Sequence, residues 1–118
     1  MHEMSICQAL ITEIEAVARD QGARRVVSVL VRAGPLSGVE PQLLEFAFSI
    51  AREGTVASDA QLAIESMPVR VHCESCGIQS AAAANRLVCE QCGDWHVRVV
   101  SGDELLLMSV ELERNSPE

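Results

Sequence analysis

Two short stretches, Cys73-Glu74-Ser75-Cys76-Gly77 and Cys89-Glu90-Gln91-Cys92-Gly93, decide how the second half of this chain folds. Each is a Cys-x-x-Cys-Gly knuckle. Such a turn brings two thiolates about 3.5 to 4 Å apart, which is the edge of a tetrahedron with metal–sulfur bonds of about 2.3 Å. The glycine that follows allows the backbone to turn with a positive φ. Together the knuckles predict one closed zinc site with four ligands, Cys73, Cys76, Cys89 and Cys92.

Other uses of four cysteines fit less well. Two structural disulfides need an oxidising compartment, and a thioredoxin-type redox pair uses a single Cys-x-x-Cys. Iron in a rubredoxin-like site uses the same ligands as zinc, and the sequence leaves that alternative open. A closed shell has no position free for substrate, so the expected role of the metal is structural.

Length and composition restrict the architecture and the partners. With 118 residues, the chain is long enough for one domain, or for a small domain with a metal-stapled lobe. Only Phe46, Phe48 and Trp95 are aromatic, so the core is expected to be aliphatic and modest. The net charge is −8, and the nine basic residues are all arginines, scattered without a cluster. This balance disfavours nucleic acid and favours protein partners or cations.

The sequence shows no sign of a membrane segment or a secretion signal. No apolar run approaches the roughly 20 residues that a spanning helix needs. The start, Met1-His2-Glu3-Met4, lacks the basic region of a signal peptide. We therefore expect a reducing, cytoplasmic location, with Cys7 as a free thiol on the apolar side of a helix, in the core rather than reactive.

Two helices are expected before the knuckles. The first runs from a capping box at Ser5-Ile6-Cys7-Gln8 to about Asp20. The second begins near Pro41, a residue favoured at the first helical position. Its buried face is predicted to contain Leu43, Leu44, Ala47, Phe48, Ile50 and Ala51.

Strands are expected between and after these helices. Arg25 to Ala33 is predicted to point Val27, Val29 and Val31 to one side and Val26 to the other. Further strands are expected at Leu62 to Met67, Trp95 to Val100 and Leu105 to Leu112, the last two forming a hairpin. The predicted fold class is α+β, with two helices packed on a small mixed or antiparallel sheet and an inserted zinc-ribbon-like lobe. Residues 1–68 with 95–118 would form the main domain, and residues 69–94 the lobe.

The amino terminus offers a second metal site. The α-amine of Met1, the amide nitrogen of His2 and the His2 imidazole can chelate one ion through linked five- and six-membered rings. Amide ligation suits metals that gain strongly from square-planar nitrogen donors, chiefly Ni(II) and Cu(II). The amide or carboxylate of Glu3, or a second histidine, could complete the shell. The site requires that Met1 is retained.

These features together resemble the HypA/HybF family of hydrogenase maturation factors. The resemblance rests on the first six residues, on Gly38 to Phe48, on Glu53-Gly54-Thr55, on both knuckles and on Gly102-Asp103-Glu104-Leu105. It covers essentially the whole chain. Two features depart from the usual pattern. Cys7 stands where a small apolar residue is more common, and His72 and His96 are not placed as in every member, so their roles stay open.

The resemblance implies a nickel metallochaperone and no enzyme. Nickel would be the cargo, bound by Met1, His2 and Glu3 in the main domain, and the four cysteines would hold a structural zinc. Expected partners are a HypB-type GTPase and the [NiFe] hydrogenase large subunit, and in some bacteria urease maturation proteins. Which hydrogenase or urease is served stays open, as do homodimerisation and coupling between the two metal sites.

Two other functions remain as alternatives. One is a zinc-ribbon protein-interaction module without nickel function, and the other is a rubredoxin-like electron carrier. No pair of polar residues in the sequence stands out as catalytic machinery.

Overall fold

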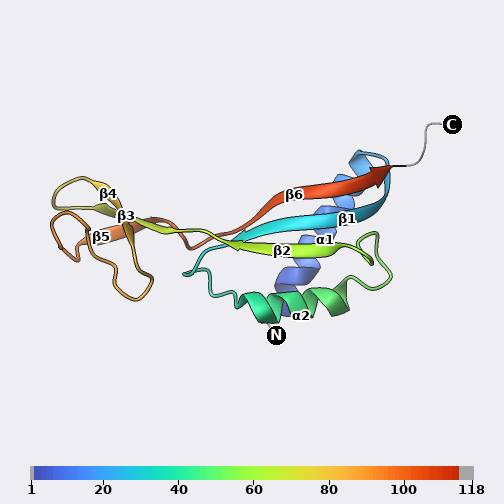
Figure 1. Ribbon diagram of the computed structural model, residues 1–118, viewed down its shortest axis with the longest axis horizontal. Coiled ribbons are helices and arrows are strands. Elements are labelled where there is room, and N and C mark those ends of the chain that lie inside the picture. Colours follow the sequence, from blue (N-terminus) through green and yellow to red (C-terminus); the bar gives the residue numbers. More distant parts are fainter. Residues whose placement is uncertain (1, 115–118) are drawn as a thin grey trace. The chain divides into compact units, whose positions relative to one another are not determined.

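A computed structural model describes residues 2–114 and has an α+β fold, as predicted. The elements are α1 (His2–Asp20), β1 (Ala23–Ala33), α2 (Pro41–Ala51), β2 (Gln61–Ser66), β3 (Val69–Cys73), β4 (Gln79–Ala82), β5 (Val97–Ser101) and β6 (Leu105–Arg114). The strands form two three-stranded sheets, ordered β2-β1-β6 and β4-β3-β5 (Figure 1). Neither helix within residues 2–114 is long and apolar enough to cross a membrane.

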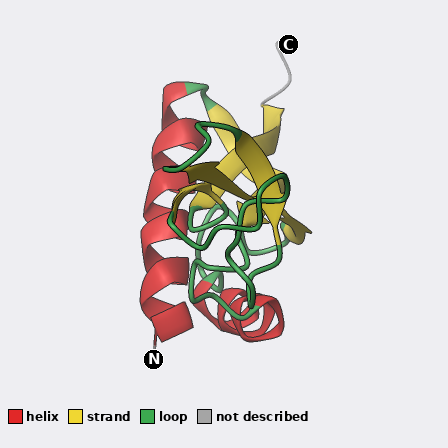
Figure 2. Cartoon of the chain, turned by 90° about the vertical axis from the view of Figure 1, so that its left-hand side faces the viewer, coloured by secondary structure: helices red, strands yellow, loops and turns green. Residues whose placement is uncertain are grey.

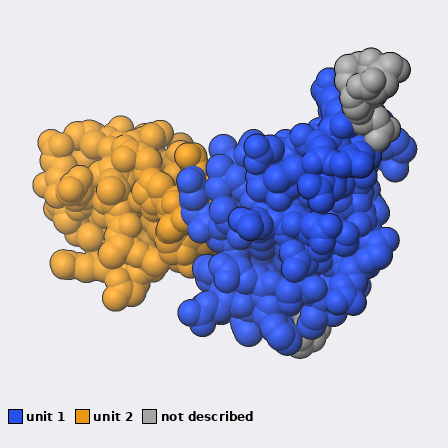
Figure 3. All heavy atoms as spheres, turned by 45° about the vertical axis from the view of Figure 1, so that its right-hand side comes forward, with its two compact units in different colours: residues 1–31, 40–65, 107–118 blue, residues 32–39, 66–106 orange. Residues whose placement is uncertain are grey.

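The chain divides into two compact units, shown in different colours in Figure 3. Unit 1 contains residues 1–31, 40–65 and 107–118, and unit 2 contains residues 32–39 and 66–106. Both helices belong to unit 1, and both knuckles belong to unit 2. The boundaries that we drew from the sequence, with residues 69–94 as the lobe, remain a proposal.

Helix α1 begins earlier than the sequence indicated. It starts at His2, so Ser5 lies inside the helix, and its predicted place as the N-cap residue is wrong. No helix breaker precedes Ser5, and Glu3 places an acidic side chain in the first turn, where the positive end of the helix dipole favours it. The chain is therefore already helical at His2 and Glu3, two of the residues predicted to bind nickel.

The two helices pack against each other inside unit 1. Figures 1 and 2 show α2 crossing α1 near the amino-terminal end of α1. Cys7 is fully buried in this contact, and its Sγ donates to the carbonyl of Leu44 at 3.4 Å. Burial, and secondarily the Glu3 carboxylate, raises the pKa of the Cys7 thiol to about 11. The prediction that Cys7 is a core residue is confirmed.

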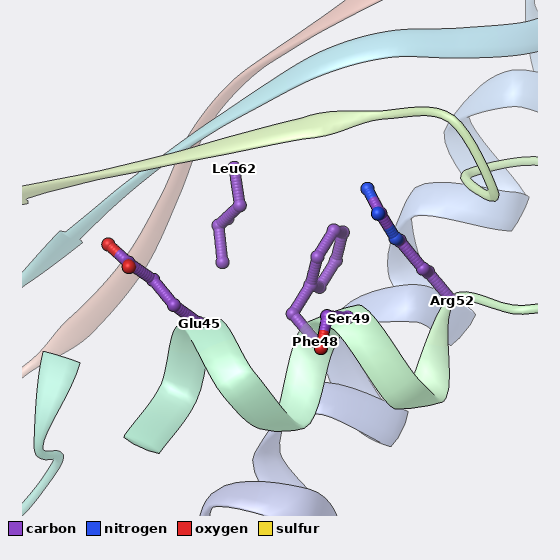
Figure 4. Close-up of a pocket in the computed structure, with 5 residues that line it drawn as sticks. All are labelled: Glu45, Phe48, Ser49, Arg52 and Leu62. Carbon is purple, nitrogen blue, oxygen red and sulfur yellow. The ribbon is translucent and has the colours of Figure 1, made fainter. Parts of the chain in front are cut away.

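The buried face of α2 is narrower than predicted. Leu44, Ala47 and Phe48 are buried, but Leu43 is 53% exposed and Ile50 is 49% exposed. Figure 4 shows the reason on one side, where the Phe48 ring rises from α2 toward Leu62 of β2. The elements around α2 cover only part of its surface. Leu43 and Ile50 lie on the uncovered part, so their side chains face solvent.

Burial along β1 does not alternate simply at the start of the strand. Val29 and Val31, predicted to share a face, are both buried. Val26, predicted on the opposite face, is completely buried as well, whereas Val27 is 37% exposed. The backbone N–H of Val26 donates to the carbonyl of Val56 at 3.0 Å. This end of the strand is therefore held against the turns that follow α2.

The predicted hairpin between the last two strands is wrong. β5 pairs antiparallel with β3, with Val71 opposite Val99, whereas β6 lies beside β1 in the other sheet. Between them, Gly102 accepts from the Leu36 N–H at 2.8 Å and Glu104 accepts from the Gly34 N–H at 2.9 Å. The turn thus bonds to residues 34–36, and β4, a strand missed in the sequence, takes the other edge of β3.

Candidate metal centres

The two knuckles of unit 2 have the same local geometry. In each, the glycine N–H donates to the carbonyl of the first cysteine at 2.9 Å, from Gly77 to Cys73 and from Gly93 to Cys89. Both glycines have positive φ, 76° and 75°, as the sequence predicted. β3 ends at Cys73 and so delivers the first knuckle from a paired strand. The second knuckle lies in the turns before β5.

The four cysteine sulfurs converge on one point. Their Sγ atoms all lie within 4.8 Å of one another. The Cys73–Cys92 and Cys76–Cys89 sulfurs are each 3.6 Å apart, so the closest approaches join one knuckle to the other. A disulfide would need about 2.05 Å, whereas a tetrahedral site with bonds of about 2.3 Å places its sulfurs a little under 4 Å apart. The donors therefore fit one tetrahedral zinc ion.

Backbone amides favour the thiolate form that a metal needs. The Cys76 N–H donates to the Cys73 Sγ at 3.4 Å, and the Cys92 N–H donates to the Cys89 Sγ at 3.5 Å. This donation from Cys92 is the main cause that lowers the pKa of the Cys89 thiol to about 6. Cys73 and Cys89 are buried, while Cys76 and Cys92 are exposed. The site is thus closed on one side and lies at the surface on the other.

Polar residues that the sequence analysis did not select hold the second knuckle in place. Asp94 accepts from the Ser75 hydroxyl, which links the two knuckles. The other Asp94 oxygen accepts from the His96 N–H at 3.1 Å and contacts the His96 Nδ1 at 2.8 Å. Ser80 of β4, a buried residue, accepts from the Glu90 N–H at 3.1 Å. Nothing in the sequence marked Asp94 or Ser80, because Ser75 and Glu90, which they contact, are 19 and 10 residues away along the chain.

The predicted nickel residues lie at the start of α1. Met1 lies outside the described residues. His2 is exposed at the first position of the helix, and Glu3 is half-buried beside it. The Glu3 Oε2 accepts from the backbone N–H of Glu40, directly before α2, at 3.4 Å. Among residues 2–114, the four cysteines are the one group of three or more metal-ligating side chains that lies close enough to share an ion.

Comparisons with known proteins agree with this arrangement. A family model described as "Hydrogenase/urease nickel incorporation, metallochaperone, hypA" matches residues 1–112. The chain is 54% identical over 112 residues to the hydrogenase maturation factor HypA of Nitrosospira multiformis, covering 95% of this chain and 97% of that protein. It is 44% identical over 113 residues to HypA of Aquifex aeolicus, covering 96% and 98% of the two chains.

The fold leads to the same family. The solution structure of the Ni metallochaperone HypA from Helicobacter pylori superimposes with a TM-score of 0.74 at 30% sequence identity, covering 96% of this chain and 98% of that one. The predicted cofactors, nickel as cargo and zinc as a structural ion, agree with this family and with the four-cysteine cluster. From the family model, the relatives and the shared fold, the chain belongs to the HypA family of hydrogenase maturation factors.

Proposed function

We propose that this protein binds Ni(II) through Met1, His2 and Glu3 and helps to insert it into [NiFe] hydrogenase during maturation, without catalysing a reaction itself. The observation that carries the proposal is the match to the nickel-metallochaperone family across residues 1–112, which includes the Met-His-Glu start. The local structure is compatible with this role, because the His2 side chain is exposed and free to meet an ion.

The first turn of α1 suits ligation by backbone nitrogen. Amides in the first turn of a helix have no intrahelical acceptor, so the amides of His2 and Glu3 can serve a metal without breaking a helical hydrogen bond. Nickel binding there would displace the amide proton and any proton carried by the α-amine or by the imidazole nitrogen that ligates the metal, so acidification releases the ion. Such a shell holds nickel firmly at neutral pH and lets a partner's ligands take it over.

Zinc would be held by Cys73, Cys76, Cys89 and Cys92, and when bound it joins the two knuckles of unit 2. The residues around it then keep those knuckles in register, through Ser75 with Asp94 and Ser80 with Glu90. The expected role of the zinc in this unit is to maintain a surface for partners. Ligation by four thiolates leaves no position for a reacting water.

The proposed partners are a HypB-type GTPase and the hydrogenase large subunit, with urease maturation proteins in organisms that make urease. We place these encounters in the cytoplasm, because all five cysteines are free thiols in the structure and the cluster needs reduced sulfur. The net charge of −8 is compatible with protein partners that present basic surfaces.

The decisive experiment is a Ni(II) titration of the zinc-loaded, untagged protein by calorimetry. Three matched samples are titrated beside it: His2→Ala, a form with one residue added before Met1, and protein whose α-amine is acetylated. The last sample is clean, because the sequence has no lysine and the α-amine of Met1 is therefore the sole primary amine. We expect about one nickel per native chain, and at least a tenfold loss of affinity in all three altered forms.

Zinc is quantified on the same samples and should not change. If the altered forms bind nickel as the native protein does, the amino-terminal chelate is wrong. The protein would then be better explained as a zinc-stabilised interaction module. A red, iron-containing preparation would instead favour the electron-carrier alternative.

A further inference from the structure

The outer side of α2 carries an apolar stripe that nothing in the described chain covers. Leu43, Phe46 and Ile50 are 53%, 63% and 49% exposed. Their spacing, i, i+3 and i+7, places them in one line along the helix. We call these three residues the α2 stripe. Leu44, Ala47 and Phe48 are instead buried on another side of α2, from which Phe48 points toward Leu62 of β2 (Figure 4).

The composition of the stripe is that of an interface core. Single exposed apolar residues are common on protein surfaces. A phenylalanine flanked by two aliphatic residues in one line is a stronger indication of an interface. This chain has three aromatic residues, and Phe46 is one of them. Buried aromatic anchors with aliphatic neighbours dominate the free energy of binding in protein interfaces. A helix face with such anchors is the kind that docks into an apolar groove of another protein.

The charges beside the stripe are acidic. Glu40 and Glu53 are exposed at the start and beyond the end of α2, whereas Glu45 lies on the side that faces Leu62 of β2 (Figure 4). The one basic residue of this segment, Arg52, is half-buried, and its guanidinium donates to the carbonyl of Ala60 at 2.6 Å. The stripe therefore has a negative border at each end. It is complementary to an apolar surface that is itself bordered by lysine or arginine.

The same charges argue against a second copy of the chain as the occupant. A two-fold dimer through the stripe would place one acidic border against the same border of the other copy. Like charges brought together in an interface cost several kcal/mol. A partner with a basic border is attracted to these acidic side chains, whereas a second copy of the chain is repelled by them.

The stripe also lies on the helix next to the proposed nickel residues. The Glu3 carboxylate accepts from the Glu40 N–H at the start of α2, so α2 and the first turn of α1 are in direct contact within unit 1. We propose that the α2 stripe is the docking site for the protein that gives or receives nickel, and that this partner presents an apolar groove bordered by lysine and arginine. The assignment of the partner to nickel transfer depends on the proposed function, while the docking site itself does not.

The test measures binding of zinc-loaded, nickel-free protein to two probes from the same organism, the purified HypB-type GTPase and the purified hydrogenase large subunit precursor. Phe46→Ala is compared with Met108→Ala, a control that trims another exposed apolar residue of unit 1. We expect Phe46→Ala to weaken binding to at least one probe by tenfold or more, and Met108→Ala to change it less than twofold. Glu53→Lys should slow association with that probe, and added salt should narrow the difference.

Folding and oligomerisation are checked on the same samples. Phe46 is exposed, so Phe46→Ala should keep the circular dichroism spectrum and the melting temperature of the unaltered protein. The proposal is overturned if both probes bind Phe46→Ala as tightly as the unaltered protein. It is also overturned if sedimentation shows a dimer that Phe46→Ala dissociates, because the occupant would then be a second copy.

A nickel titration of Phe46→Ala separates this inference from the proposed function. We expect Phe46→Ala to bind nickel normally while His2→Ala does not. If His2→Ala keeps its nickel but Phe46→Ala loses its partner, the docking site stands and the amino-terminal chelate fails. If nickel depends on His2 but no probe depends on Phe46, the chelate stands and the docking site fails.

Discussion

Gly34 lies so close to the backbone of Gly102 in unit 2 that there is no room for a side chain at Gly34. A Cβ atom on Gly34 would lie 2.0 Å from the carbonyl oxygen of Gly102. The segments are joined on either side of this contact by the hydrogen bonds from Gly34 to Glu104 and from Leu36 to Gly102. The contact fixes where the chain leaves β5, and it explains why β5 and β6 do not form a hairpin.

We expect Gly34→Ala to destabilise the protein by about 3 kcal/mol or more, because a Cβ atom 2.0 Å from the Gly102 backbone forces that backbone to move. Gly38→Ala is the control in the same unit. It has no atom within 4 Å of its new Cβ and suffers only from its φ of +79°, which costs about 1 to 2 kcal/mol. Chemical denaturation of zinc-loaded protein, followed by fluorescence of the single tryptophan, measures both. Equal stability of the two variants would contradict the steric account.

Removal of one cysteine ligand should abolish stable zinc binding. We expect Cys92→Ser to lose the ion on dialysis against a mild chelator, because a three-sulfur shell is open to water. Cys7→Ala should retain about one zinc per chain, since Cys7 packs against α2 in unit 1. Elemental analysis gives the zinc content of each. Substitution with Co(II) gives an independent measure, because tetrahedral thiolate ligation has a characteristic visible spectrum. Retention of zinc by Cys92→Ser would refute four-cysteine ligation.

The ion pairs at the end of β6 predict a pH dependence. The Glu113 carboxylate accepts from the Arg24 Nε at 2.6 Å and from the Arg25 guanidinium at 3.0 Å. Hydrogen bonding from Arg24, then from Arg25, lowers the pKa of Glu113 below its ordinary value of 4.5. Because the folded pKa is lowered, the stabilisation is present above about pH 4.5 and disappears as the pH falls through the folded value.

Glu113→Gln tests whether the charge of the Glu113 carboxylate stabilises the folded protein. We expect the variant to melt at a lower temperature than the unaltered protein at pH 7, with a small difference because the pair is exposed. The difference should shrink as the pH falls below 4.5. Thermal melts from pH 3 to pH 8 at low salt provide the measurement. A difference that is independent of pH would mean that the carboxylate charge is not what stabilises this end of the sheet.

The features that sequence predicted well are those set by nearby residues. The convergence of the four cysteines follows from two local turns, and the glycines after Cys76 and Cys92 have the expected positive φ. The burial of Cys7 follows from the periodicity of one helix. Each of these depends on residues within a few positions of one another, so the pattern alone contains the physical cause.

The features that sequence missed depend on distant partners. The strand at residues 79–82 is small and polar, and it is visible only through its pairing with β3. The support given by Asp94 and Ser80 comes from other turns. Leu43 and Ile50 were placed in the core because they are apolar, but their burial depends on how many sides of α2 are covered. The pattern of apolar residues shows which side chains favour burial, but it does not show whether other elements of the chain pack over them.

The contact between Glu3 and Glu40 allows the two roles of Glu3 to be separated. Glu3→Gln keeps a side-chain acceptor for the Glu40 N–H, whereas Glu3→Ala removes it. We expect Glu3→Ala to lower the free energy of unfolding by about 1 kcal/mol, as loss of a helix-capping acceptor does, and Glu3→Gln to lower it less.

Nickel binding by the same two variants tests the second role of Glu3, as a ligand of the metal. If the Glu3 carboxylate contributes to the nickel shell, both variants lose its negative charge, and we expect each to bind Ni(II) about tenfold more weakly in calorimetry. Zinc content serves as the control, since the cysteines are in the other unit. If Glu3→Gln titrates with nickel as the unaltered protein does, the carboxylate only holds α2, and the contribution of Glu3 to the metal is limited to its amide.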